Sequence, residues 1–331
     1  MSHAHDAGFK QRLLWRHRLG RVFAWLCGLA TWSSLLFLAV LLGAVVWQAA
    51  GWLSWEFLGR FDSGVPEKAG IVAGLLGSMW LIVLTALFCV PIGIGAAIYL
   101  EEYAHPNWFT RFVQLNISNL AGVPSIVYGM LGFTAFVRMF GLPKETYVLS
   151  LGFASVRFTL PFGRTVIAGA LTLTLLSLPV VIIAAQEALR SVPATLRHAA
   201  YALGATKWQT IWRQVLPAAL PGILTGVILA LSRALGETAP LAVLGAATYI
   251  TFAPGRIAKW GDLWSRPASL LQAPFDNFTA LPLQIYNWVN ESNPKFQHVA
   301  AAAIVVMLIL LVLLNGSAIY IRERFQRRMR W

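Results

Sequence analysis

Long stretches without charge constrain this chain more than any other feature. A helix needs about 20 apolar residues to cross the hydrocarbon core of a bilayer. Five charge-free stretches have that length: Val22–Trp55, Ala69–Leu100, Phe112–Val137, Thr165–Gln186 and Phe296–Ile321. A sixth apolar stretch, Gly222–Tyr249, is interrupted by Arg233 and Glu237. The pattern predicts an all-α polytopic membrane protein with six transmembrane helices.

The composition excludes other broad classes of protein. Hydrophobic residues make up 58% of the 331 positions and charged residues 12%, whereas soluble proteins are about half apolar and about a quarter charged. A water-soluble enzyme or a disordered chain of this composition would expose apolar surface that it cannot cover. The net charge is +13, but Lys and Arg gather at the chain ends and in short loops. That distribution is typical of topology signals and lipid headgroup contacts, not of nucleic-acid binding.

The basic residues also predict the orientation. Residues 1–21 and 322–331 form basic tails. An even number of spans places both tails on one side, and their charge makes that side the cytoplasm. The first transmembrane helix is expected at 22–49. It is longer than the apolar region of a signal peptide and no cleavage site follows it, so we expect it to stay in the protein.

The segment 249–297 then lies outside the membrane on the opposite face. It is rich in aromatic residues and proline. Aromatic side chains at this depth are typical of a membrane-interface belt. The same composition fits a docking surface for an extracytoplasmic partner, and both interpretations stay open.

The predicted cytoplasmic loop at 187–222 is longer and more regular than a simple connector. Ser191 is expected to cap a first helix, with Pro193 in its first turn. Gly204 is expected to end that helix. A second helix follows and is expected to end at Leu216-Pro217. The loop is therefore predicted to be a helix–turn–helix.

Both predicted loop helices carry an apolar face. Thr206 and Gln209 have the spacing of a capping box at the start of the second helix. The apolar faces consist of Leu196, Ala199, Ala200 and Leu203 in the first helix and Trp208, Ile211, Trp212 and Val215 in the second. This face is expected either to pack against the chain's own helices or to dock a cytoplasmic partner.

One run in the loop resembles a known family. The run His198-Ala199-Ala200-x3-Gly204-x9-Gln214-x-Leu216-Pro217 resembles the EAA loop of binding-protein-dependent ABC transporter permeases, whose pattern is E-A-A-x3-G-x9-I-x-L-P. His198 stands in place of the family's Glu, and Gln214 in place of its Ile. The resemblance implies a type I ABC importer transmembrane domain over 71–321. It also implies a set of residues that couple the loop to an ATPase: His198, Ala199, Ala200, Gly204, Ala205, Leu216 and Pro217.

Three further runs resemble the phosphate permeases, and most of all their A-type subunit. They are Asn119–Gly129, Ser232–Pro240 and Ala280–Trp288. The resemblance implies a heterodimer with a second permease subunit, two copies of an ATP-binding subunit and an extracytoplasmic phosphate-binding protein. A permease for another oxyanion, such as sulfate or molybdate, remains an alternative.

Several motifs are missing from the sequence. The dipeptide Gly-Lys does not occur, so the chain has no P-loop and ATP hydrolysis is expected in a separate subunit. The sequence has no HExxH or nucleophile-elbow motif, and Cys27 and Cys89 form no CxxC. We therefore expect a transport subunit without enzymatic activity, cofactor or metal. The alternative is a secondary transporter or channel that works without an ATPase, but such proteins usually carry internal repeats, which this sequence lacks.

The charged pair inside the sixth apolar stretch is the strongest candidate for the substrate path. Arg233 and Glu237 are four residues apart, so they share one face of a helix. A charge in mid-bilayer costs about 2.5–3.5 kcal/mol, which favours a role in a water-filled path or a pairing inside the protein. A guanidinium group suits a phosphate oxyanion. A purely structural pair is the alternative.

Other residues are weaker candidates for the path. Arg157 and Arg164 precede the fourth span and are expected near the outer mouth, where they could guide an anion or contact lipid headgroups. Ser125, after Pro124, could expose a helix N-terminus to an anion, or the proline could simply kink a helix. A stripe of small residues fits either a partner subunit or packing within the chain: Gly222, Gly226 and Ala230.

Overall fold

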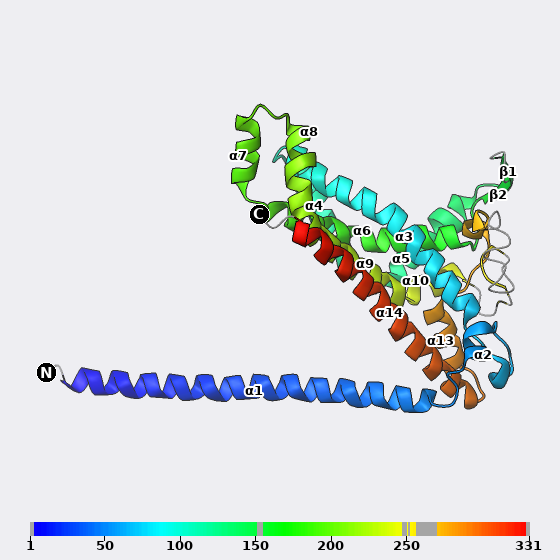
Figure 1. The fold of residues 1–331 in the computed structure, drawn as a ribbon, viewed down its shortest axis with the longest axis horizontal. Helices are drawn as coiled ribbons and strands as arrows, with labels where there is room; N and C mark the ends of the chain where they lie inside the picture. Colours follow the sequence, from blue (N-terminus) through cyan, green and yellow to red (C-terminus); the bar gives the residue numbers. More distant parts are fainter. Residues whose placement is uncertain (1–2, 151–154, 247–249, 251, 256–269, 329–331) are drawn as a thin grey trace.

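The computed structural model describes residues 3–150, 155–246, 250, 252–255 and 270–328 (Figure 1). The long helices are α1 (His3–Ala49), α3 (Val72–Ile98), α4 (Trp108–Ala121), α6 (Val166–Arg190), α9 (Leu216–Gly236) and α14 (Lys295–Arg328). The short helices are α2 (Trp55–Gly59), α5 (Ser125–Gly132), α7 (Ala194–Ala202), α8 (Lys207–Thr210), α10 (Ala239–Leu244) and α13 (Leu281–Val289). Single π-helical turns form η2 (Tyr99–Tyr103), η3 (Phe133–Val137) and η5 (Ile211–Val215), and 3-10 turns form η1 (Pro66–Lys68), η4 (Met139–Gly141) and η6 (Ala273–Phe275).

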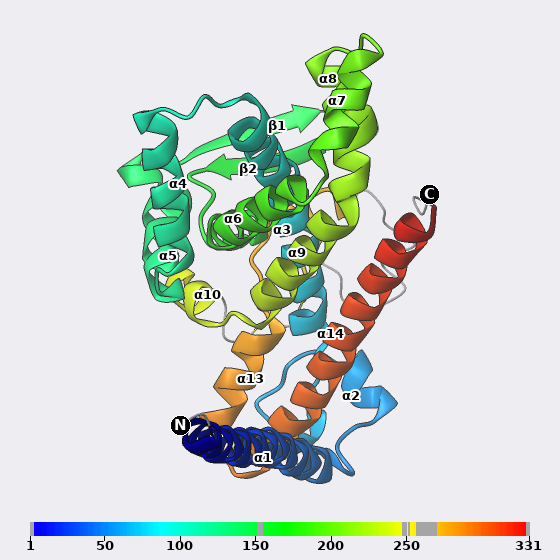
Figure 2. The same cartoon turned by 90° about the vertical axis from the view of Figure 1, so that its left-hand side faces the viewer.

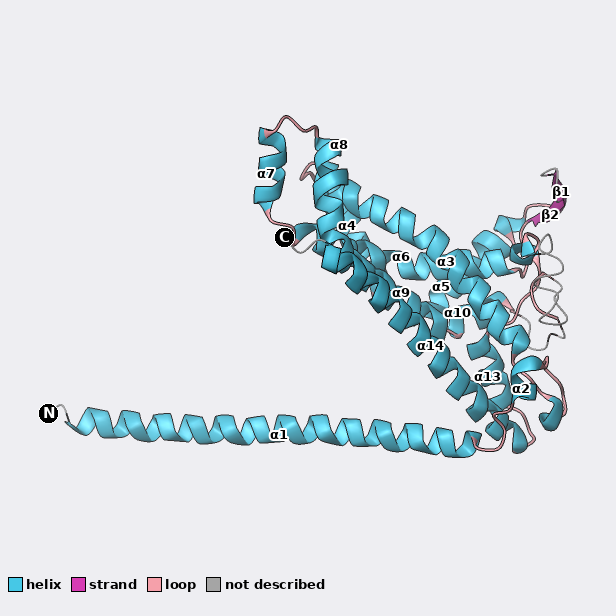
Figure 3. Cartoon of the chain, in the orientation of Figure 1, coloured by secondary structure: helices cyan, strands magenta, loops and turns pink. Residues whose placement is uncertain are grey.

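The fold departs from the all-α prediction at one hairpin. Strands β1 (Glu145–Ser150) and β2 (Ser155–Leu160) pair antiparallel, with Glu145 opposite Leu160 (Figure 3). Their β-branched and aromatic residues favour strands over helix. The ring of Phe158 lies 5.5 Å from the rings of both Tyr147 and Phe275, so the hairpin is packed onto the segment after the fifth span.

The predicted membrane spans are confirmed, with two changes. Five helical segments are long and apolar enough to cross a membrane: 15–49, 72–103, 166–190, 207–236 and 295–324. The predicted third span, 112–137, is a bent pair of helical segments. Residues 108–121 and 125–137 meet at an angle of 106°. The fifth span was predicted at 222–249, which is wrong. The helix ends at Gly236 and begins earlier, in the loop.

Several of the short elements lie at two opposite ends of the molecule. Helices α7 and α8 lie at one end, which we call the loop end, and the hairpin, α2 and α13 lie at the other, the hairpin end (Figure 1). Helices α3, α6, α9 and α14 run between the two ends (Figures 1 and 2). Helix α1 is helical from His3, so the predicted basic tail continues the first span. Only its last part lies beside α14 (Figure 1). None of the 18 residues of its most apolar stretch is buried.

Helix α6 is the centre of the bundle and packs against both α3 and α9. Glycines allow these close approaches. A Cβ added at Gly93 of α3 would lie 2.7 Å from Val181, and one added at Gly226 of α9 would lie 2.2 Å from Ala184. The small-residue stripe on α9 therefore packs within the chain, which decides between its two interpretations.

The described part of the 249–297 segment packs on the hairpin end of α3. A Cβ at Gly77 would lie 2.0 Å from the carbonyl oxygen of Thr279. The Leu281 amide donates to the Ser78 hydroxyl at 2.9 Å. The segment is thus part of the folded body where it is described. Its residues 256–269, with two of the tryptophans, lie outside the described residues.

A buried carboxylate lies at the hairpin end, outside the membrane spans. One oxygen of Asp62 accepts from the Trp288 indole at 3.1 Å and from the Ser63 amide at 2.9 Å. Burial raises the pKa of Asp62 from 3.8 to about 6, although these hydrogen bonds lower it. Burial therefore makes Asp62 harder to ionise than an exposed aspartate, and the carboxyl loses its proton only near pH 6 in the folded protein.

We predict that the hairpin end becomes less stable as the pH rises through about 6. A raised folded-state pKa means that the contribution of Asp62 is complete below its ordinary value of 3.8 and is lost through about pH 6. A shift of this size corresponds to at most about 3 kcal/mol. Asp62→Asn keeps the accepting oxygen and removes the charge, so thermal unfolding between pH 4 and pH 8 should lose this dependence.

The control for this prediction is Glu67→Gln, at an exposed ion pair with Lys295. It should leave the change near pH 6 in place. An Asp62→Asn protein that still loses stability between about pH 4 and pH 6 would assign the effect to another group.

Candidate coupling loop and charged path

The turn of the predicted helix–turn–helix is present at Gly204. Its φ of +80° lies in the left-handed region, where residues other than Gly, Asn and Asp are strained. The next helix starts with the predicted capping box. The Gln209 amide donates to the Thr206 hydroxyl at 3.3 Å, and the Thr206 amide donates to the Gln209 side chain at 2.9 Å. The local turn chemistry of the loop is thus confirmed.

Two other predictions for the loop are wrong. Ser191 does not start α7. It ends α6, and its hydroxyl donates to the Ala188 carbonyl at 2.8 Å. Pro193 stands at the N-terminus of α7 instead. Nor does the chain end a helix at Leu216-Pro217: the π turn η5 leads straight into α9. A wider turn relieves the clash that Pro217 would make with the preceding turn.

The loop has an exposed apolar surface at the loop end. Leu203, next to the turn, is 90% exposed, and the stacked rings of Trp208 and Trp212 are 58% and 56% exposed. Ile211 and Val215 are buried. The predicted single face of the second helix therefore divides into an outward pair of tryptophans and an inward aliphatic pair. We call Leu203, Trp208 and Trp212 the loop-tip surface.

The remaining residues of the family motif surround that surface. His198, Ala199 and Gly204 are exposed, whereas Ala200, Ala205, Leu216 and Pro217 are half-buried. The loop thus leaves the first part of the motif open to a partner.

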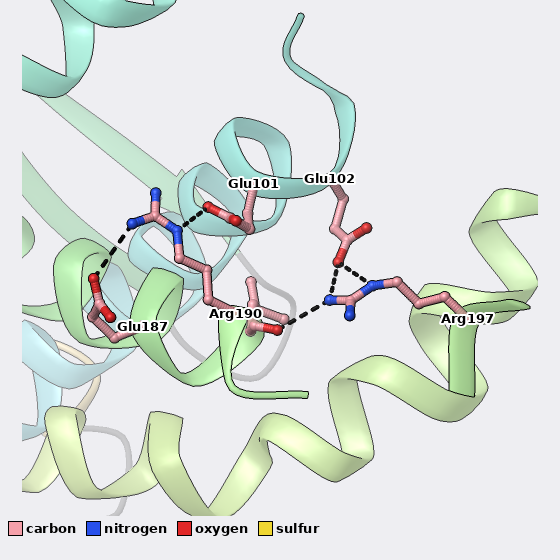
Figure 4. A network of polar contacts seen from close by, with 6 residues as sticks. Glu101, Glu102, Glu187, Arg190 and Arg197 are labelled. Atoms are coloured by element: carbon pink, nitrogen blue, oxygen red, sulfur yellow. Dashed lines mark hydrogen bonds and ion pairs between the residues drawn. The ribbon is translucent and has the colours of Figure 1, made fainter. Parts of the chain in front are cut away.

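Ion pairs that the sequence analysis missed hold the loop to the bundle (Figure 4). Arg197 of α7 donates to Glu102 of η2 at 2.8 Å, and the two side chains are only 19% and 9% exposed. The same guanidinium donates to the carbonyls of Leu189 at 3.0 Å and Val192 at 2.8 Å. Arg190, at the end of α6, pairs with Glu101 at 2.8 Å.

These contacts left a signal in the sequence. Glu101 and Glu102 are adjacent carboxylates directly after an apolar span, on the side where the loop carries its Arg residues. Opposite charges at one end of a helical bundle favour pairing. The partners could not be assigned, because they depend on the angle between α6 and α7.

The predicted pair of Arg233 and Glu237 is present at 3.3 Å. It lies at the end of the fifth span, since α9 ends at Gly236 and Glu237 is in extended conformation. Only Nε of Arg233 contacts the carboxylate. Neither terminal nitrogen of that guanidinium donates a hydrogen bond to a described residue, and the side chain is 54% exposed, against 17% for Glu237. The two outer nitrogens are therefore free to bind an anion.

Two of the signature runs meet beside this pair. Helix α5, from the run 119–129, packs against α10, which follows Glu237. A Cβ at Gly129 would lie 2.7 Å from the Cα of Pro240. The break between α4 and α5 and the break between α9 and α10 therefore belong to one region of the bundle.

The weaker path candidates lie on three different elements of the fold. Ser125 is half-buried and begins α5. Arg164 precedes α6, and its guanidinium lies against Gly245, where a Cβ would approach Nε to 2.8 Å. Arg157 lies on β2, and its backbone pairs with the side chain of Gln272 at 2.6 and 3.0 Å. Arg157 thus belongs to the hairpin end and makes no contact with Arg233 among the described residues.

The region offers cationic donors, not metal ligands. Among the residues that the structure describes, no three His, Cys, Asp or Glu side chains come close enough to hold a metal ion. A free guanidinium edge next to helix breaks can bind an oxyanion through charge-assisted hydrogen bonds.

Together, spans that contain helix breaks and an exposed helix–turn–helix define a polytopic membrane protein whose loop end can dock a partner. Residues 89–331 match the family described as Binding-protein-dependent transport system inner membrane component, and the chain belongs to this family. The protein is thus a permease-type membrane domain, as the loop motif predicted.

Individual relatives agree with this assignment. The chain is 33% identical over 206 residues to the probable ABC transporter permease protein YqgI of Bacillus subtilis, covering 61% of this chain and 63% of that protein. It is 35% identical over 182 residues to the phosphate transport system permease protein PstA of Mycobacterium leprae, covering 54% and 53%. It is 32% identical over 260 residues to PstC of Mesorhizobium japonicum, covering 75% and 76%. The chain thus spans less than two thirds of the length of YqgI and of the M. leprae protein.

Solved structures share the fold. An alginate ABC transporter in complex with a pentasaccharide-bound periplasmic protein has a TM-score of 0.60 at 16% identity, covering 92% of this chain and 94% of that one. The inward-facing MetNI methionine ABC transporter has a TM-score of 0.53 at 17% identity, covering 77% and 95%. The fold is that of a type I ABC transporter membrane domain, as predicted.

We predict that the turn at Gly204 tolerates Asn but not Val. Valine in the left-handed region costs about 1–2 kcal/mol, whereas Asn adopts it readily. No atom lies within 4 Å of a Cβ at this position, so space is not limiting. Limited trypsin digestion at Lys207 should be several-fold faster in Gly204→Val and near the parental rate in Gly204→Asn. Equal rates in the two variants would show that backbone conformation does not hold the turn.

Proposed function

We propose that the protein is the transmembrane permease subunit of an ATP-driven inorganic phosphate importer, forming half of the translocation path. The observation that carries this proposal is the exposed loop-tip surface inside the EAA-type motif, at one end of a bundle of the permease family. The cargo is inferred from relatives named phosphate transport system permease proteins. The free guanidinium edge of Arg233 suits that cargo.

The proposed partners follow from this role. The loop docks a separate ATP-binding subunit, present in two copies. A second, different permease subunit completes the path, and an extracytoplasmic phosphate-binding protein delivers the anion. The absence of a P-loop in the sequence supports a separate ATPase.

The proposed orientation places the loop end and both termini in the cytoplasm of a bacterial inner membrane. The basic chain ends and the Arg-rich loop support it. Reporter fusions at Lys10 and Arg324 should then be active on the cytoplasmic side, and one near Asp276 on the outside. A cytoplasmic signal from the Asp276 fusion would contradict this orientation.

The direct test is purification with the neighbouring subunits and an ATPase assay in nanodiscs. We expect an ATP-binding subunit to copurify and its hydrolysis to rise when phosphate-loaded binding protein is added. Stimulation by sulfate or molybdate instead of phosphate would change the cargo. Uptake in liposomes without any ATPase would replace the proposal with a secondary transporter or channel.

We further propose that Arg233 binds phosphate in the path. Glu237 holds the guanidinium by Nε and lowers its net field, so the anion can leave again. Ser125, at the start of α5, lies in the region where the two helix breaks meet. Arg164 and Arg157 are proposed to guide the anion near the outer mouth, since both are exposed.

We predict that Arg233→Gln abolishes phosphate uptake while the complex still assembles. The change removes the fork and leaves Glu237 as a lone carboxylate. The double variant Arg233→Gln/Glu237→Gln has no unpaired charge, so a purely structural pair should recover in it. If Arg233 instead binds phosphate in the path, the double variant should stay inactive in phosphate uptake. Uptake restored to near the parental level in the double variant would refute the proposed role.

A further inference from the structure

Three consecutive residues of the π turn η2 each contact a cation from a successive part of the loop. Glu101 pairs with Arg190 at the end of α6, at 2.8 Å. Glu102 pairs with Arg197 of α7, at 2.8 Å. The Tyr103 ring lies 5.0 Å from the ammonium nitrogen of Lys207, the first residue of α8. The π turn thus contacts the end of α6 and both helices of the helix–turn–helix.

The middle contact is the most strongly built. All three nitrogens of Arg197 donate: Nε and Nη2 to Glu102, Nη2 also to the Leu189 carbonyl and Nη1 to the Val192 carbonyl. The last two accept at the joint between α6 and α7. Arg197 therefore fixes α7 to η2 and to the end of α6 at once (Figure 4). A mostly buried guanidinium with every nitrogen used can hold only one orientation.

The π turn continues α3, which crosses the bundle to the hairpin end. There α3 is packed without a gap: Gly74 and Gly77 lie against the segment 279–284. The same helix therefore contacts the loop at one end and the outer segment at the other. Any rotation of α7 that preserves the Arg197 contacts must move the end of α3.

We propose that η2 is a latch that clamps the coupling loop to α3, and that Arg197 is the positioning residue of this latch. It makes α7 and α3 move as one unit, so that docking of the ATP-binding partner is transmitted along α3. The part that concerns the partner rests on the proposed function. The clamping itself does not, because it is a property of this chain alone.

The first experiment measures clamping in the full chain, in nanodiscs, without partners. The chain's two cysteines, Cys27 and Cys89, are replaced, and a spin label is attached at L203C, the exposed loop tip. In Arg197→Gln and in Glu102→Gln/Arg197→Gln the label should become several-fold more mobile. Arg213→Gln is the matched control, since this exposed Arg of the same loop has no ion pair among the described residues.

The double variant separates a latch from simple charge balance. It leaves no unpaired charge, so a pair that only avoids a buried charge should return to parental mobility. Parental mobility in the double variant, or equal mobility in Arg197→Gln and Arg213→Gln, would overturn the latch. The label mobility in Arg197→Lys should lie between those of the parent and Arg197→Gln, because lysine keeps the charge but not the planar set of guanidinium donors.

The second experiment measures coupling in the assembled complex. Phosphate taken up per ATP hydrolysed should fall by about tenfold in Arg197→Gln, with the ATP-binding subunit still copurifying. If Arg197→Gln keeps the parental ratio of phosphate uptake to ATP hydrolysis although its loop is mobile, docking is not transmitted along α3. If sulfate rather than phosphate stimulates ATP hydrolysis in the parent, the proposed cargo is wrong. The spin-label experiment still tests the latch, because it uses no cargo.

Discussion

The close packing of α6 against α3 and α9 is the constraint on which the rest of the structure depends. In a membrane, apolar surface gains little from leaving lipid, so helices associate by tight van der Waals packing through small residues. Gly93 of α3 and Gly226 of α9 supply these contacts with α6. Because the three helices are fixed close together, their loop ends are fixed too. Glu102 and Arg197 can meet only for that reason.

The same packing makes the broken spans tolerable. A break in a membrane helix frees backbone groups that lipid cannot satisfy, so such breaks occur only where protein or a polar cavity surrounds them. Here the break before α5 and the break before α10 lie together, with Gly129 pressed against Pro240. The Arg233–Glu237 pair lies at the second break, so irregular backbone and an ion pair share one place. Such sharing is typical of substrate sites in transporters.

The sequence was informative where local chemistry decides structure. The capping box at Thr206, the left-handed turn at Gly204 and the pairing of Arg233 with Glu237 depend on residues a few positions apart, and all are confirmed. It was misleading where tertiary contacts decide. A proline usually ends a helix, but the wider π turn η5 accommodates Pro217 and the helix continues into α9. The Arg197–Glu102 pair joins residues 95 positions apart, and no local pattern could assign it.

The ion pairs Arg197–Glu102 and Arg233–Glu237 differ in burial, and this difference suits them to different roles. The guanidinium of Arg197 is mostly buried and uses all its nitrogens on the protein. Losing one partner there would leave a buried charge, which costs about 3–5 kcal/mol, so such a pair suits a fixed joint. The guanidinium of Arg233 is half exposed and uses only Nε. A cation held by one edge keeps the other edge for an anion, and its exposure lets water replace that anion. A joint must not exchange its partners, whereas a transport site must, and the burial of each pair matches its proposed task.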